Sequence, residues 1–212
     1  MIRPRERIEE FGEVFTSERE VNAMLDLIPD ETNRIDSRFL EPACGSGNFL
    51  IEILKRKILV VEAKYAKHQP DFERYAFLAL SSVYGIDLLE DNIVECRGRL
   101  LNHILGIYER NFPSSQCIKF KLALKFVLSK NILVGDALKL TLPKTTSPII
   151  FSEWSLVSGN KVKRVDYTLT NLIAYQPFEG DSLFSDLGDS AFIPAPLKSF
   201  PTVIYKELHN VE

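Results

Sequence analysis

Hydrophobic residues recur along much of the chain with the spacing of helices, and short apolar runs separate these periodic segments. The helical spacing predicts one or two helices within 5–29 and further helices from Asn48 onward and over 72–80, 91–108 and 117–128. The short runs predict strands at 38–41, 82–86 and 132–134. Strands that alternate with helices predict an α/β fold with a largely parallel sheet and helices on both faces.

The ends of several elements carry local signals. Ser17 is a suitable helix N-cap, with Glu20 three residues later as its capping-box partner. Pro29 and the polar stretch after it are expected to end the first helical segment, and Pro70 is expected to interrupt the helical pattern. The expected strand at 82–86 runs into Asp87. Since parallel strands place their carboxyl ends on one edge, that edge is the expected ligand site.

The pattern changes after residue 147. Two runs rich in strand-forming residues, 149–157 and 161–168, flank Ser158–Gly159–Asn160 and predict a β-hairpin. From residue 171 the chain is rich in turns, with a short helix expected at 202–208. We expect 1–37 to be a helical segment that packs on the ligand site, 38–147 to be the α/β core, and 148–212 to be a hairpin and an irregular extended tail of the same domain.

Composition and charge restrict the compartment, the kinds of site and the mode of DNA contact that we expect for the chain. There is no run of about 18 apolar residues, so no membrane span is expected, and the charged N-terminal residues do not resemble a secretory signal. Three cysteines without C-x-x-C spacing favour the reducing cytoplasm over a disulfide framework or a zinc site. His68, His103 and His209 are isolated, so no metal site is expected. The net charge of −3 implies that any DNA contact is local or is supplied by another chain.

Gly45 and Gly47 form the strongest chemical signal. They follow an expected strand and precede a helix, so the backbone can adopt positive φ and approach a ligand near the helix N-terminus. A third glycine at dinucleotide spacing and a G-K-[ST] sequence are both absent, which disfavours a dinucleotide site and a phosphate-binding P-loop. The alternative is a tight turn that serves packing only.

The full string Glu-Pro-Ala-Cys-Gly-Ser-Gly-Asn-Phe at 41–49 resembles motif I of amino-group DNA methyltransferases, particularly modification subunits of restriction systems. The upstream Phe-Gly-Glu-Val-Phe-Thr-Ser at 11–17 is similar to the same family's preceding cofactor motif, although Ser17 replaces the more usual proline. The resemblance covers about 8–140. It implies a Rossmann-like class I methyltransferase fold, S-adenosylmethionine as cofactor, and DNA adenine-N6 as the methyl acceptor.

The resemblance also implies roles for individual residues. Asp87 would accept the ribose hydroxyls, and Asp136 would receive the adenine amino group of the cofactor. Glu41 would face the methionine ammonium. The alternatives are a strand-end or N-cap role for Asp87 and an Asx turn for Asp136. The expected cofactor-binding residues are Phe15, Thr16, Glu41, Pro42, Ala43, Cys44, Gly45, Gly47, Asn48, Phe49, Asp87, Leu88, Asp136 and Ala137.

The catalytic string of this family, Asn/Asp/Ser-Pro-Pro-Tyr/Phe, is absent from the 212 residues. The nearest string is Tyr-Gln-Pro-Phe at 175–178, and the expected position holds Ser152, Glu153 and Trp154, which are weak candidates for a divergent site. The expected function is an adenine-N6 DNA methyltransferase of a restriction-modification system. DNA would be reached with help from a partner chain, such as a restriction or specificity subunit. The alternative is a non-catalytic cofactor-binding or scaffold subunit.

Two charged segments bear on DNA contact. Lys161, Lys163 and Arg164 lie on the second expected hairpin strand, where they either contact phosphates or form a solvated face. The segment 179–189 carries acidic residues and no basic ones, so it would repel a DNA backbone.

Overall fold

In its described part, the N-terminal helical segment contains two short helices. The structure, a computed structural model, describes residues 16–115, 118–173 and 194–210. Helix α2 (Glu18–Leu25) begins at Ser17, and the reciprocal hydrogen bonds between Ser17 and Glu20 confirm the predicted capping box. Pro29 starts helix α3 (Pro29–Thr32) rather than only ending the previous segment, because a proline at the first helical position loses no intrahelical bond. The part of the predicted 5–29 segment before residue 16 lies outside the described residues.

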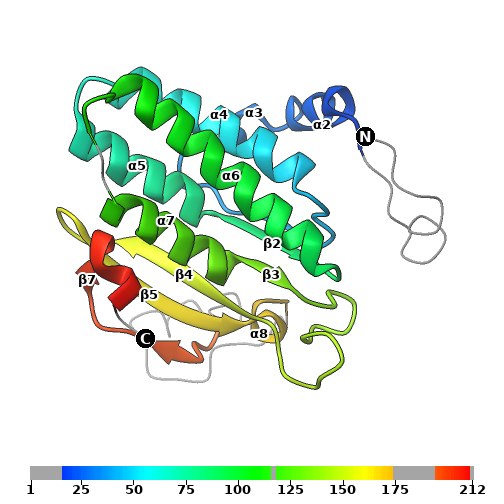
Figure 1. Cartoon of the computed structure of the whole chain (residues 1–212). Helices are drawn as coiled ribbons and strands as arrows, with labels where there is room; N and C mark the ends of the chain where they lie inside the picture. Colours follow the sequence, from blue (N-terminus) through cyan, green and yellow to red (C-terminus); the bar gives the residue numbers. More distant parts are fainter. Residues whose placement is uncertain (1–15, 116–117, 174–193, 211–212) are drawn as a thin grey trace, which may run out of the picture.

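Three parallel strands form the central sheet in the order β1-β2-β3 (Figure 1). They are β1 (Phe39–Glu41), β2 (Val83–Asp87) and β3 (Ile132–Val134). All three were predicted, and their pairing confirms the parallel arrangement. Their carboxyl ends therefore share one edge, which brings together the residues that follow each strand.

The long helices occupy one side of this sheet, as Figure 1 shows for α4 and α6. They are α4 (Asn48–Tyr65), α5 (Gln69–Ser81), α6 (Glu90–Asn111) and α7 (Ile118–Asn131). Pro70 lies in the first turn of α5, so it begins this helix instead of interrupting the pattern. Within the part of the chain that is described, no helix combines the length and the hydropathy needed to cross a membrane.

The predicted hairpin is confirmed. Strands β4 (Ile150–Leu156) and β5 (Lys161–Thr168) pair antiparallel along the whole length of β4, and Gly159 adopts φ +53° in the loop between them. The tail adds two short strands to β5, β6 (Lys198–Ser199) and β7 (Val203–Ile204), followed by the 3-10 helix η2 (Tyr205–Asn210). Residues 205–208 of the expected helix over 202–208 are helical, as part of η2, whereas residues 203–204 pair with β5. The expectation of an irregular tail is corrected for the described part, because β6 and β7 pair with β5.

The hairpin covers the second face of the parallel sheet. Tyr84 and Ile86 of β2 pack against Ile149, Phe151 and Leu169. The last of these begins the short helix α8 (Leu169–Ile173). The expectation of helices on both faces is thus corrected: in the described residues, the long helices cover one face, and the hairpin with α8 covers the other. The hairpin supplies the apolar surface that buries this face of β2.

Candidate functional site

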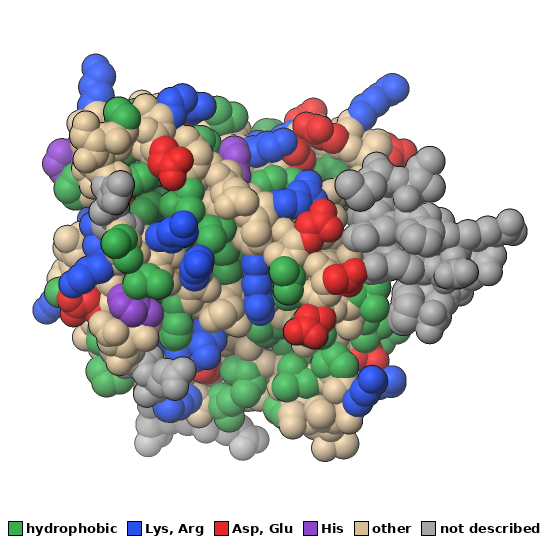
Figure 2. Space-filling view, viewed as in Figure 1, with side chains coloured by type: hydrophobic (Ala, Val, Ile, Leu, Met, Phe, Trp, Pro, Cys, Tyr) green, Lys and Arg blue, Asp and Glu red, His purple; other side chains and the backbone are tan. Residues whose placement is uncertain are grey.

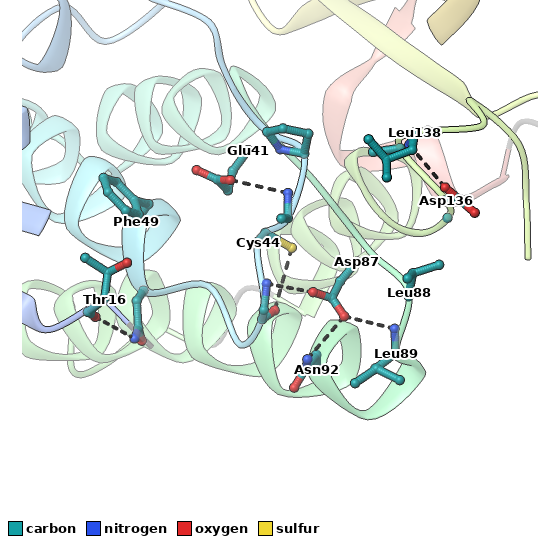
Figure 3. Close-up of a pocket in the computed structure, with 16 residues that line it drawn as sticks. Thr16, Glu41, Cys44, Phe49, Asp87, Leu88, Leu89, Asn92, Asp136 and Leu138 are labelled. Atoms are coloured by element: carbon teal, nitrogen blue, oxygen red, sulfur yellow. Dashed lines mark hydrogen bonds between the residues drawn. The ribbon is translucent and has the colours of Figure 1, made fainter. Parts of the chain in front are cut away.

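A pocket of about 470 Å³ opens at the carboxyl edge of the parallel sheet. The segments that follow β1, β2 and β3 all contribute to its wall, together with Thr16 from the N-terminal segment (Figure 3). The topology of parallel strands explains this convergence. The lining residues are Thr16, Glu41, Pro42, Ala43, Cys44, Gly45, Asn48, Phe49, Asp87, Leu88, Leu89, Asn92, Gly135, Asp136, Ala137 and Leu138.

The two glycines of the turn after β1 have different surroundings. Gly45 lines the pocket with φ +52°, and a Cβ built on it would meet no atom within 4 Å. Gly47 is the N-cap of α4 with φ +86°, and a Cβ there would lie 2.5 Å from the Cys96 Sγ atom on α6. Gly45 therefore leaves open space toward a ligand, whereas Gly47 allows the turn to approach α6 closely.

Arg99 of α6 holds the glycine turn in place through hydrogen bonds. Its guanidinium donates to the Ser46 carbonyl at 2.7 Å and to the Asn48 side-chain oxygen at 2.9 Å. The Asn48 side-chain nitrogen in turn donates to the Thr16 carbonyl at 3.1 Å. This chain of contacts links the N-terminal segment, the glycine turn and α6 around the pocket.

Asp87 connects the ends of β1 and β2 through its carboxylate (Figure 3). Oδ2 accepts from the Gly45 N–H at 2.9 Å, while Oδ1 accepts from the Leu89 N–H at 2.9 Å and from the Asn92 side chain at 3.1 Å. A carboxylate offers roughly four acceptor positions, so three of them are already used. Asp87 has room for about one further donor, and a second ribose hydroxyl would need to replace one of these bonds.

Asp136 follows β3 and lines the same pocket. Its Oδ1 accepts from the backbone N–H groups of Leu138 and Lys139 at 3.1 and 3.0 Å, which is the Asx turn considered as the alternative from sequence. The hydrogen bond from the Lys139 backbone, followed by the one from its side chain, holds the pKa of Asp136 below its usual value. The carboxylate is therefore charged at neutral pH and faces the pocket while it orders its own loop.

Two further polar groups of the pocket wall are Glu41, the last residue of β1, and Cys44 in the turn that follows. Glu41 Oε1 accepts from the Ala43 N–H at 3.3 Å at the pocket wall. A hydrogen bond with Cys96 and burial raise the pKa of the Cys44 thiol. A protonated thiol is a poor nucleophile.

The sequence-predicted cofactor residues converge on this pocket with two exceptions. Gly47 does not line it, and Phe15 lies outside the described residues. Four lining residues were not predicted: Leu89, Asn92, Gly135 and Leu138. Each lies within five residues of Asp87 or Asp136, so extending the prediction along the loops after the two strands would have found them.

The weak catalytic candidates do not line this pocket. Trp154 is buried, donates from Nε1 to the Asn131 side-chain oxygen at 3.0 Å, and packs edge-on against Phe77 and Phe126. Ser152 is buried and forms part of the wall of a separate hollow. The structure therefore places these two side chains in packing contacts of the hairpin and away from the glycine turn.

Two charged groups of the hairpin pair with nearby side chains. The third candidate, Glu153, accepts from the Arg38 guanidinium at 2.5 Å. Arg164 forms a buried bidentate pair with Asp166, at 2.8 and 2.7 Å. Arg164 is thus unsuited to a phosphate contact, whereas Lys161 and Lys163 are exposed.

Comparison of the chain with protein-family models, with curated proteins and with solved structures found no match.

Proposed function

We propose that the chain binds S-adenosylmethionine in the pocket at the carboxyl edge and serves an adenine-N6 DNA methyltransferase of a restriction-modification system. The observation that carries this proposal is the convergence of three acidic residues around an open glycine turn: Glu41 and Asp87 end β1 and β2, and Asp136 follows β3. Glu41, Asp87 and Asp136 all line one pocket with Gly45. These side chains offer acceptors for the ammonium, hydroxyl and amino groups of the cofactor.

Each part of the cofactor, from the methionine to the adenine, has suitable residues in the pocket lining. Glu41 would attract the methionine ammonium, and Asp87 would accept from the ribose while its bond to Gly45 holds the turn in place. Leu88 and Leu138, which are both exposed at the pocket, would cover the adenine ring, with Asp136 at its amino edge. Bound S-adenosylmethionine supplies an electrophilic methyl group. The chain's own contribution is to hold and orient it.

The second candidate function is a non-catalytic subunit that binds the cofactor or supports a larger complex. The observation that favours it is the packing of Ser152 and Trp154 within the hairpin, together with the absence of an Asn/Asp/Ser-Pro-Pro-aromatic string from the sequence. An amino-group methyltransferase needs acceptors for the target amino group and a surface for the flipped base. In the methyltransferase proposal, a partner chain supplies these groups.

Charge on the described surface supports a local DNA contact. Helix α7 carries four lysines and no acidic residue, whereas the first turn of α6 beside the pocket carries Glu90 and Asp91. Figure 2 shows this separation, with blue side chains over α7 and red ones near the start of α6. Phosphates would therefore be attracted to the α7 side and not to the rim beside α6.

Calorimetry with S-adenosylmethionine tests the binding proposal. We expect a dissociation constant in the micromolar range, about −8 kcal/mol. Asp87→Asn removes the charge and one acceptor from the ribose position, so it should weaken binding by roughly 1–3 kcal/mol. Asp71→Asn, on α5 and not part of the pocket wall, is the matched control and should bind normally. Absence of binding to the wild-type chain would reject the proposed cofactor site.

A methyl-transfer assay separates the two candidate functions. The purified chain is given tritiated S-adenosylmethionine and mixed-sequence DNA, alone and with the products of neighbouring genes. We expect no incorporation by the chain alone and labelled adenine when the partner is present. Incorporation by the chain alone would contradict the need for a partner. Cofactor binding without transfer under any of these conditions would favour the non-catalytic subunit.

A further inference from the structure

The outer edge of β1 has free backbone hydrogen-bonding groups among the described residues. β1 lies at one end of the three-stranded sheet and pairs only with β2 in the described part of the chain. The Phe39 N–H donates to the Ser82 carbonyl on the β2 side at 3.0 Å. Along a strand in a parallel pair, the backbone N–H and C=O groups of successive residues point alternately to the two sides. The backbone groups of Glu41 therefore point toward β2, like those of Phe39, and the backbone groups of Leu40 point to the opposite side. The N–H and C=O groups of Leu40 therefore point along the sheet, away from β2.

An apolar hollow lies beside this edge. It has a volume of about 180 Å³, several times the roughly 30 Å³ that one water molecule occupies in the liquid. Leu40 and Leu172 contribute to its wall and are 45% and 38% exposed, respectively. Aromatic rings close its floor, where Tyr84 and Phe151 meet edge-on at a centroid separation of 5.4 Å. The unpaired backbone thus adjoins an open apolar surface.

The usual protections of an edge strand are missing at Leu40. Native proteins commonly block such edges with lysine, proline or a bulge. Here the central residue is leucine. Arg38, which immediately precedes β1, and Glu153 of the hairpin both line the hollow beside Leu40, and they pair with each other at 2.5 Å. This ion pair directs the Arg38 guanidinium toward β4.

We propose that the outer edge of β1 accepts an extended strand from a second polypeptide, parallel to β1, with apolar side chains at alternate positions. One such side chain would enter the hollow beside Leu40, while the strand's backbone pairs with the Leu40 N–H and C=O groups. The carboxyl end of this strand would emerge beside Glu41 and Pro42, at the wall of the cofactor pocket. The partner could thereby place its own residues next to the pocket.

This inference rests on the proposed function for its choice of occupant. The pocket lining offers groups suited to a cofactor, and Ser152 and Trp154 are engaged in the hairpin. A strand paired with the outer edge of β1 would end beside Pro42 at the pocket wall and could bring acceptor-binding groups there. A second copy of the same chain would bring only the same set of residues, so we assign the edge to a different protein.

Amide hydrogen exchange on the full chain tests the proposal. The probe is a synthetic peptide of alternating threonine and valine with lysines at both ends. In the free chain, the Leu40 N–H should exchange faster than those of Phe39 and Glu41, which face β2. With the peptide, protection of the Leu40 N–H should rise about tenfold or more, equivalent to about 1.4 kcal/mol.

Leu40→Lys should abolish this peptide binding, because a lysine at the edge disfavours strand addition. Leu59→Lys is the matched control, since Leu59 is an exposed leucine on α4, and it should leave peptide binding unchanged. If Leu40 in the free chain is as protected as Phe39 and Glu41, the edge is already covered and the proposal fails. Sedimentation then distinguishes a second copy from coverage within one chain. Failure of the peptide to protect Leu40 also overturns the proposal.

Calorimetry on the same samples keeps the two proposals separate. If S-adenosylmethionine binds while the peptide leaves Leu40 unprotected, strand docking is wrong and the cofactor proposal remains. If the peptide protects Leu40 but S-adenosylmethionine does not bind, docking is supported and the proposed function is wrong.

Discussion

Substitution of Gly47 by alanine tests how the glycine turn is built. Gly47 has φ +86°, and an added Cβ would lie 2.5 Å from the Sγ atom and 3.3 Å from the Cβ atom of Cys96. Gly45 also has positive φ, +52°, but a Cβ there would meet no atom within 4 Å. A comparison of alanine at Gly45 with alanine at Gly47 therefore separates the cost of a left-handed backbone from the cost of a steric overlap.

The expected magnitudes follow from these two geometries. A left-handed conformation costs a residue with a Cβ roughly 1–2 kcal/mol, which applies to both substitutions. Overpacking of a filled site adds about 1–3 kcal/mol at Gly47, since Cys96 is buried. We therefore expect Gly45→Ala to lower the free energy of unfolding by about 1–2 kcal/mol and Gly47→Ala by about 2–5 kcal/mol.

Urea denaturation measures these free energies, and the double variant Gly47→Ala/Cys96→Ala provides the control. Removing Sγ relieves the closest overlap, so the double-mutant cycle should show a favourable coupling of about 1–3 kcal/mol. The same cycle with Gly45→Ala should show none. Equal unfolding free energies for Gly45→Ala and Gly47→Ala, or no coupling to Cys96, would refute the assignment of Gly47 to close packing on α6.

Three further substitutions address groups away from the glycine turn. Trp154→Ala should cost about 3–5 kcal/mol of stability in urea denaturation, while the folded variant keeps its affinity for S-adenosylmethionine in calorimetry. Arg164→Met should cost about 3–5 kcal/mol in thermal or urea unfolding, because it leaves the Asp166 carboxylate buried without its partner. Burial lowers the pKa of Lys57 to about 7, so the unfolded chain binds more protons between pH 7 and about 10.5. Wild-type stability should therefore rise with pH in this window relative to Lys57→Met, which removes the titrating group; equal pH profiles would contradict this.

The pocket at the carboxyl edge was predictable because its acidic residues lie at or just beyond the ends of strands. A parallel sheet brings the ends of its strands to one edge, so Glu41, Asp87 and Asp136 could be placed together without knowledge of any distance. The hairpin was predictable for a similar local reason, the loop around Gly159 between two strand-like runs. In both cases a short stretch of sequence determines the geometry.

Features that depend on contacts between distant segments could not be predicted. The role of Gly47 depends on Cys96, and the burial of Trp154 depends on Asn131 and Phe77. The alternation of the hairpin strands shows that one face is apolar, but it does not identify the surface that this face covers. For this reason, the sequence alone predicted helices on the face where β4 and β5 lie.

The position of the hairpin also bears on catalysis. A strand that continued the parallel sheet beyond β1 would run beside Leu40 and could deliver the residues after it to the pocket at Pro42. β4 cannot do this, because each of its residues is paired with β5 and its Ser152 carbonyl accepts from the Tyr84 hydroxyl at 3.2 Å. Bringing 152–154 to the pocket would require breaking this pairing and exposing Trp154. Addition of a strand from another chain at the β1 edge requires neither change, which makes it the less costly way to complete the site under the proposed function.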